Sequence, residues 1–172
     1  MVISIIGLLS AVVLTSLSAS RSSARNAQRL QNIDQIAKAL QIVTTGTTNQ
    51  LPASGGTAVC LGKAFCWCLG STCIIEEYPP LTGLLKSGIS GEELPLDPFW
   101  VDGQNGDAYV YNAIATSPGP TGAYLYWTME GLSSQRCGRG TVLSVDTTTR
   151  TGGVPSYSCR LYLGPPTPGN II

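Results

Sequence analysis

The chain has 172 residues, which is room for one domain beside a long helix. Charged residues make up 12% of it, about half the usual share, and the net charge is zero. No basic run with interleaved aromatic residues is present, so we expect no nucleic-acid partner. No histidine is present either, which excludes a Ser-His-Asp or Cys-His catalytic group, and we expect no enzyme.

Residues 1–45 carry one uninterrupted helical pattern that changes character part-way. Residues 1–17 contain no charge and are apolar on every face of a helix. The helical spacing then continues, with Arg21, Arg25 and Arg29 at every fourth position. The apolar face of this second part consists of Leu30, Ile33, Ala37 and Leu40.

The apolar segment, residues 1–17, predicts a membrane-embedded or filament-core helix. Seventeen helical residues span about 25 Å, slightly less than a hydrocarbon core of about 30 Å. The alternative is a secretory signal peptide with a cleavage point near residues 16–20, although no basic region precedes the apolar core and the helical pattern runs through that point. The residues that we expect in the filament core or membrane are Val2, Ile3, Ile5, Ile6, Gly7, Leu8, Leu9, Val12, Val13 and Leu14.

The three arginines of the second part have two interpretations. The preferred one is a solvated helix face, because long charged side chains on a helix usually point into water. The alternative is that they pair with acidic groups on a neighbouring subunit.

Six cysteines in a chain of this length predict an oxidising compartment and disulfides. Four of them form a cluster whose pairing the spacing does not decide, although Cys60 with Cys73 would close a small loop. A zinc site is disfavoured, since the cluster contains no C-x2-C pair and the chain has no histidine. The cluster consists of Cys60, Cys66, Cys68 and Cys73.

The rest of the chain predicts a connecting region and then a sheet. Residues 46–93 form a Cys-rich connecting loop region that begins where Gly46 ends the helix. Residues 94–163 form the sheet domain, and residues 164–172 a tail.

Four candidate strands lie in the sheet domain, and their short connections predict antiparallel neighbours. The second strand alternates, with Leu125, Trp127 and Met129 on one face. The predicted fold class is therefore α+β, a long N-terminal helix packed on a small antiparallel sheet of about four strands. The candidate strands are residues 108–115, 123–130, 141–146 and 157–163.

Residues 2–13 (VISIIGLLSAVV) resemble the interior of the N-terminal signature of type IV pilins and of the pseudopilins of type II secretion. A second similarity is the order of residues 95–98 (PLDP) and 109–111 (YVY), which resembles the Pro-x-Asp-Pro turn and Tyr-x-Tyr strand of pseudopilins. The family's basic leader, cleavage glycine, methylated first residue and Phe-Thr-Leu-Ile-Glu opening are not in this sequence. We therefore expect that Met1 is not the natural start. The helix also lacks the proline that kinks many pilus-forming pilins, which favours a pseudopilin-like or minor subunit.

The resemblance implies a structural subunit of a type IV pilus-like or type II secretion-like filament that polymerises through its N-terminal helix. Its implied partners are identical or homologous subunits and the inner-membrane assembly machinery. Its implied location is the inner membrane, as a single-pass precursor, and then an extracytoplasmic or cell-surface filament. Cys137 is expected to pair with Cys159, which would staple the last two strands and resembles the C-terminal disulfide loop of type IV pilins. The alternative function is a membrane-anchored or secreted disulfide-rich module for binding or adhesion.

The loop before the first candidate strand is rich in acidic and amide side chains. Ordinary turn chemistry is the preferred interpretation, because Asp, Asn and Gly favour turns. A calcium ion is the alternative, since this cation prefers several oxygen ligands and some pseudopilins bind it near this place, although the spacing is not that of an EF-hand. A catalytic carboxylate pair is the least favoured interpretation, and no other cofactor is expected. The residues concerned are Asp97, Asp102, Asn105 and Asp107.

Overall fold

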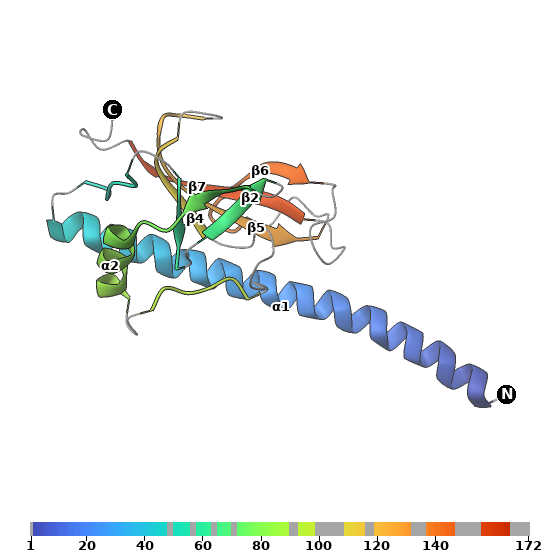
Figure 1. The fold of residues 1–172 in the computed structure, drawn as a ribbon. Coiled ribbons are helices and arrows are strands. Elements are labelled where there is room, and N and C mark those ends of the chain that lie inside the picture. Colours follow the sequence, from blue (N-terminus) through green and yellow to red (C-terminus); the bar gives the residue numbers. More distant parts are fainter. Residues whose placement is uncertain are drawn as a thin grey trace.

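In the computed structural model, one long helix lies along an antiparallel sheet (Figure 1). The described residues are 2–47, 50–55, 58–62, 65–69, 72–89, 93–98, 109–115, 119–131, 137–146 and 156–165, with only the backbone for 2–16, 47, 65–69, 72–76, 145 and 146. The elements in chain order are α1 (Val2–Thr47), β1 (Val59–Leu61), β2 (Phe65–Leu69), β3 (Thr72–Glu76), α2 (Pro79–Gly88), β4 (Tyr109–Ala115), β5 (Gly122–Glu130), β6 (Thr141–Asp146) and β7 (Ser156–Gly164).

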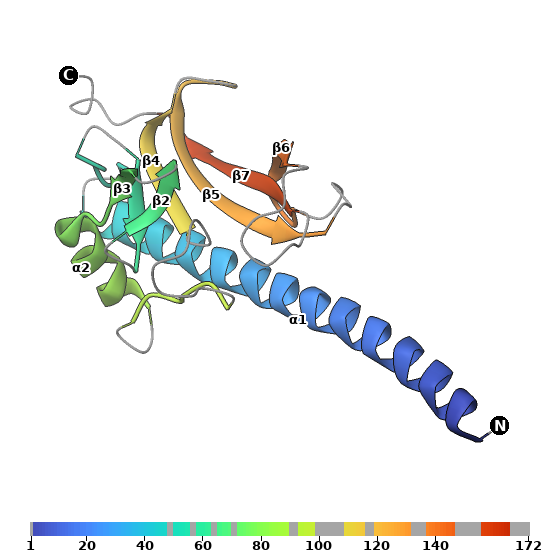
Figure 2. The same ribbon diagram turned by 45° about the vertical axis from the view of Figure 1, so that its right-hand side comes forward.

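The helix α1 has 46 residues and is therefore about 69 Å long. It ends at Thr47, two residues beyond the predicted boundary, because Gly46 alone does not stop a helix whose last turn is otherwise unobstructed. Two views show that the C-terminal half of α1 lies against the sheet, while the N-terminal half projects beyond it (Figures 1 and 2). The single unbroken helix expected from the sequence is confirmed.

Within the described residues, the main sheet has five strands in the order β1-β4-β5-β7-β6, and all neighbours are antiparallel. The four predicted strands correspond to β4, β5, β6 and β7, each within one residue at either end. The expectation of about four strands was one too low, because β1 joins the edge beside β4. β1 has only three residues, too few for its alternation to stand out in the sequence.

The connecting region, residues 46–93, contains more regular structure than the sequence predicts. β2 and β3 form a separate two-stranded antiparallel sheet, and α2 follows directly. The start of α2 carries two prolines. The first turn of a helix tolerates proline, because the N–H groups of that turn have no acceptor inside the helix and the missing N–H costs no hydrogen bond. Leu81 and Leu85, four residues apart, form its buried face.

The core lies between α1, the inner face of the sheet and α2. The predicted alternation in β5 is confirmed, since Leu125, Trp127 and Met129 are all buried on this inner face. α2 crosses α1 closely, because a Cβ added to Gly88 would lie 3.4 Å from the Cβ of Ala39. The α1 residues of this core cluster are Ile33, Ile36, Ala39 and Leu40.

Candidate functional site

The N-terminal half of α1 is the first candidate region. Its predicted filament-core residues, from Val2 to Leu14, lie in the helix, and their side chains are outside the described residues. Residues 17–21, where side-chain description begins, are all exposed, and Leu17 keeps 45% of its surface accessible. Within the described part of the chain, no helix has the combination of length and apolarity needed to cross a membrane.

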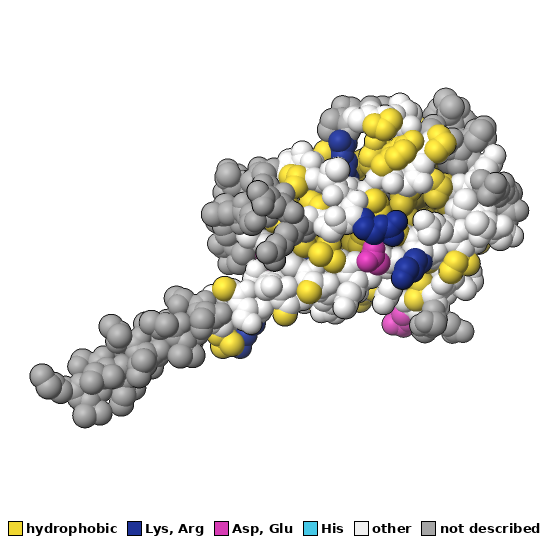
Figure 3. Space-filling model, turned by 180° about the vertical axis from the view of Figure 1, so that it is seen from behind, with side chains coloured by type: hydrophobic (Ala, Val, Ile, Leu, Met, Phe, Trp, Pro, Cys, Tyr) yellow, Lys and Arg dark blue, Asp and Glu magenta, His cyan; other side chains and the backbone are white. Residues whose placement is uncertain are grey.

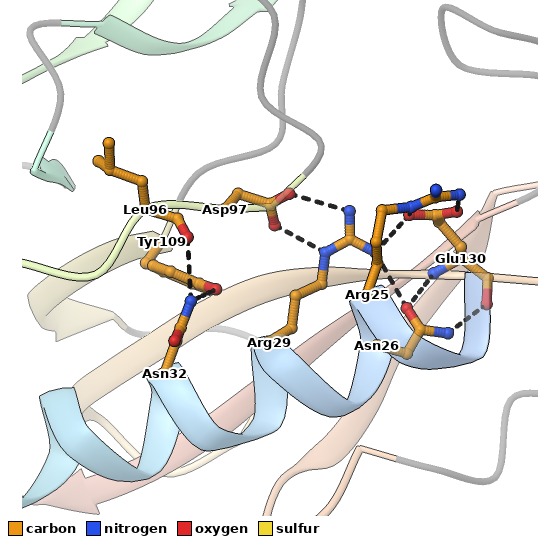
Figure 4. A network of polar contacts seen from close by, with 8 residues as sticks. All are labelled: Arg25, Asn26, Arg29, Asn32, Leu96, Asp97, Tyr109 and Glu130. Carbon is orange, nitrogen blue, oxygen red and sulfur yellow. Dashed lines mark hydrogen bonds and ion pairs between the residues drawn. The ribbon is translucent and has the colours of Figure 1, made fainter. Parts of the chain in front are cut away.

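The arginines of α1 form the second candidate region, and the solvated-face interpretation is wrong for two of them. Arg29 is buried, with 1% of its side chain accessible, and Arg25 is about three-quarters buried. Both pair with carboxylates of their own chain: Arg29 with Asp97 and Glu130, and Arg25 with Glu130 (Figure 4). The reason is tertiary: the end of β5 brings Glu130, and the segment of residues 93–98 brings Asp97, onto this face of the helix. Arg21 is exposed, as the preferred interpretation expected.

Arg29 connects three parts of the chain that are far apart in sequence. Its Nε and Nη2 donate to the two carboxylate oxygens of Asp97 at 2.7 and 2.9 Å. Its Nη1 donates to Glu130 Oε1 at 2.7 Å and to Asn26 Oδ1 at 3.0 Å. A fork-to-fork pair of this kind fixes the orientation of both groups as well as their distance.

Glu130, at the end of β5, is held through its side chain and its backbone. Arg25 Nε donates to Oε1 at 2.8 Å, and Arg25 also pairs with Oε2. Asn26 donates from Nδ2 to the Glu130 carbonyl at 2.8 Å and accepts from the Glu130 amide at 3.0 Å. The Asn26 amide therefore occupies the end of β5 as a neighbouring strand would, and it satisfies both backbone groups.

One turn further along α1, Asn32 continues the polar strip. Its Nδ2 donates to the Leu96 carbonyl at 2.9 Å and to the Tyr109 hydroxyl at 2.8 Å. The first bond holds the segment that carries Asp97, and the second reaches the start of β4. Figure 4 shows these contacts in a row along one side of α1.

The charges of this network balance, with two guanidinium groups against two carboxylates. Burial by itself lowers the pKa of Arg29, but hydrogen bonds and charges from Asp97 and Glu130 outweigh it and raise that pKa above its ordinary value. Burial by itself raises the pKa of Glu130, while hydrogen bonds and charges from Arg25 and Arg29 bring it below its ordinary value. The shifts of both pKa values favour the charged forms of Arg29 and Glu130, and the network is a buried ionic cluster.

Two hollows lie where α1 leaves the sheet, and both are lined by Ala19, Ser22 and Glu130. Their volumes are about 430 and 380 Å³. The first lining also includes Leu17 and Arg21, while the second includes Leu30, Met129 and Tyr157. Both hollows thus lie along the described stretch of α1 between the network and Leu17.

The disulfides form the third candidate region. The predicted Cys137–Cys159 bond is present, with the two Cα atoms 5.7 Å apart and both residues buried. Cys60 is disulfide-bonded as well, and no described cysteine is free. The side chains of Cys66, Cys68 and Cys73 lie outside the described residues, so the pairing within the cluster stays a prediction. In the backbone of the β2–β3 hairpin, Cys68 lies opposite Cys73.

Tyrosines cluster on the sheet face that points away from α1. The ring centre of Tyr124 lies 5.9 Å from that of Tyr126 and 5.2 Å from that of Tyr162. The guanidinium of Arg160 lies 5.4 Å from the centre of the Tyr124 ring. Tyr162 is the exposed member of the set. The contacts of Tyr124 with Tyr162 and Arg160 join β5 to β7 on the outer face, as cross-strand pairs do, whereas Tyr124 and Tyr126 are neighbours on β5 itself.

The expected calcium or turn residues are only partly visible. Asp97 is committed to Arg29, whereas Asp102, Asn105 and Asp107 lie outside the described residues. Among the described side chains, no group of three or more acidic or cysteine residues is arranged to hold a metal ion. The calcium hypothesis therefore stays a prediction.

Sequence reasoning missed Glu130, Asn26 and Asn32 as members of the network. A signal was available for two of them: Asn32 precedes Ile33 of the apolar helix face, and Glu130 ends a largely apolar strand. Comparison of the chain with family models, with curated proteins and with solved structures found no match.

Proposed function

We propose that this protein is a non-enzymatic structural subunit of a type IV pilus-like or type II secretion-like filament, which polymerises through the N-terminal half of α1. The observation that carries the proposal is the division of α1. One half packs on the sheet, and the other, which begins with the uncharged apolar residues 2–17, projects beyond the domain (Figures 1 and 2).

Apolar surface of this extent needs a covering other than water. Burying one large aliphatic side chain is worth about 1.5–3 kcal/mol, and the segment carries nine apart from Gly7: Val2, Ile3, Ile5, Ile6, Leu8, Leu9, Val12, Val13 and Leu14. A bilayer before assembly and a bundle of identical helices afterwards are two environments that would cover it. We propose identical or homologous subunits as the partners, with inner-membrane machinery transferring them from membrane to filament.

The rest of the molecule suits a domain displayed outside the cell. The disulfides favour an oxidising compartment. On the face in Figure 3, charged side chains are few, while hydrophobic ones gather over the sheet. A domain with so few repelling charges can pack closely against copies of itself.

A charge placed in the projecting half of α1 tests the proposal. In the full chain, Leu9→Lys should abolish filaments and large assemblies, because a buried lysine in a helix bundle would lack a partner. The matched control is Ser20→Lys, which adds the same charge to an exposed position of the same helix and should assemble like the wild type. Sedimentation and negative-stain electron microscopy in detergent-free buffer provide the measurement.

Two outcomes would count against a filament subunit. A wild-type chain that is monomeric without detergent would remove the need for a covering partner. Binding of the wild type to lipid vesicles as separate monomers, with no filament under any condition, would favour the membrane-anchored binding module.

A further inference from the structure

The spacing of the four-cysteine cluster leaves several pairings open, and the backbone register around the β2–β3 hairpin distinguishes them. We propose that Cys60 bonds to Cys66 and that Cys68 bonds to Cys73. The first bond then ties the hairpin to the main sheet, and the second closes the hairpin on itself. The inference concerns this cluster alone and does not depend on what the N-terminal half of α1 binds.

The partner of Cys60 lies within the cluster. Cys60 is disulfide-bonded, and the C-terminal disulfide uses both cysteines outside the cluster. Within one chain, its partner is therefore Cys66, Cys68 or Cys73. Whichever one it is, the other two are left for the second bond.

Cys60 lies beside the end of β3, on the outer side of the main sheet. Its neighbours in β1, Val59 and Leu61, belong to the main core, whereas Cys60 is buried in a separate small cluster with Val110. Successive residues of a strand face opposite sides of a sheet, so Cys60 faces away from the main core. Its backbone forms a bridge to Glu77, the residue that follows β3. Glu77 therefore marks the part of the hairpin that lies next to Cys60.

Cys73 is too far along β3 to reach Cys60. It precedes Glu77 by four residues, which is about 13 Å along a strand. Neighbouring strands lie about 5 Å apart, so the Cα atoms of Cys60 and Cys73 are separated by at least about 8 Å. A disulfide joins Cα atoms that are about 4.4–6.8 Å apart. Cys68 lies opposite Cys73, at the same distant end of the hairpin, and is excluded for the same reason.

Cys66 lies at the end of the hairpin that adjoins Cys60. Its neighbour Phe65 is the register partner of Glu76, the residue directly before Glu77. The pairing of β2 with β3 is irregular at this point, and the extra residue on β2 is Cys66 itself. The extra residue of such a bulge is unpaired in the ladder, which leaves it for a contact outside the hairpin. Cys66 is therefore the cluster cysteine that suits Cys60.

The remaining pair satisfies an independent criterion. Cys68 and Cys73 are direct register partners on antiparallel strands. Directly opposite residues of such strands share a face, and their Cα atoms lie about 4.5 or 5.5 Å apart. Both separations fall in the range that a disulfide spans. The distance argument for Cys60 and the register of the hairpin thus lead to the same pairing.

This pairing has a consequence for the edge of the main sheet. Among the described strands, β1 is the outermost one beside β4, and its other side meets Glu77. An open strand edge is a place where a strand of another chain can add. With the Cys60–Cys66 bond, the protein's own hairpin is fastened beside this edge.

Peptide mapping of the oxidised wild-type full chain tests the pairing. Thiols are blocked with N-ethylmaleimide at slightly acid pH, and the unreduced, denatured protein is digested with trypsin and chymotrypsin. Cleavage after Lys63 and Trp67 divides the cluster into fragments that carry its first cysteine, its second, and its last two. By mass spectrometry, we expect the first two fragments joined to one another and the third separate, with an internal bond.

Either of the other pairings would join all three fragments into one species, and that result would overturn the inference. Cluster cysteines found carrying N-ethylmaleimide before reduction would overturn it as well.

Paired substitutions give a second readout, the number of thiols that react in the unreduced, denatured chain. C60S with C66S removes one complete bond and should leave no reactive thiol. The matched control, C66S with C73S, also removes two cysteines, but one from each bond. It should leave two reactive thiols, because Cys60 and Cys68 are too far apart to join. Two thiols in the first variant, or none in the control, would contradict the proposed pairing.

Discussion

Replacing Arg29 by methionine keeps an unbranched side chain in the space beside the sheet but removes the guanidinium. Arg29 donates three hydrogen bonds to carboxylates, two of them to Asp97. Glu130 would keep its ion pair with Arg25, so the carboxylate of Asp97 would lose the most stabilisation. The side chain of Asp97 is buried, with 2% of its surface accessible. Breaking a buried ion pair from one side costs about 3–5 kcal/mol, and the remaining Arg25–Glu130 pair places the expected loss near the lower limit, about 3 kcal/mol.

Two further variants calibrate this value. Arg25→Met should cost about 1 kcal/mol, because a quarter of the Arg25 side chain is already exposed and Glu130 would retain Arg29. Arg139→Gln should cost less than about 0.5 kcal/mol, since its pair with Asp34 is 3.7 Å long and largely exposed. Urea unfolding of the full chain in a mild detergent gives these free energies from midpoints, provided that the slope against urea concentration is unchanged.

A double-mutant cycle separates the ion pair from the packing of the side chain. Asp97→Asn added to Arg29→Met should recover part of the loss, because a neutral amide then takes the place of the carboxylate that has lost the guanidinium, with a coupling of about 1–3 kcal/mol. The reasoning would be refuted if Arg29→Met cost no more than Arg139→Gln, or if the two substitutions at 29 and 97 were additive.

Three other outcomes are expected. Cys137→Ala with Cys159→Ala should lower the free energy of unfolding by about 3 kcal/mol, since the bond closes a loop across a separation of 22 residues, and an unchanged midpoint would contradict this. The pKa of Glu130 is lower in the folded state than in the unfolded state. Its contribution to the free energy of unfolding is therefore fully present at pH values above its ordinary pKa of about 4.3, and it is lost as the pH falls through the folded-state pKa. In the Glu130→Gln variant, the urea midpoint should therefore decrease less steeply as the pH is lowered into the acid range. A decrease identical to that of the wild type would argue against a lowered pKa of Glu130. Excess chelator should leave the melting temperature unchanged if the loop beyond residue 98 holds only turns, whereas a decrease that Asp102→Ala or Asp107→Ala abolishes would establish calcium.

The sequence alone was sufficient for the elements with a strong local period. The helix of 46 residues was predicted because no proline interrupts it and its apolar positions recur at helical spacing. β5 was predicted because alternating residues must face one core, and Leu125, Trp127 and Met129 do so. The short elements β1 and α2 were missed, since three residues and one pair of leucines carry little periodicity.

What tertiary structure decided was the partner of each charge. A helix with arginines at every fourth position predicts one charged stripe, and nothing local distinguishes exposed Arg21 from buried Arg29. The difference arises because Asp97 is 68 residues away from Arg29 and Glu130 is 101 residues away, and only the folded chain brings both to the same turn of α1. Periodicity along a chain specifies which side of a helix is apolar, but electrostatic pairing depends on distance in space, which the sequence does not contain.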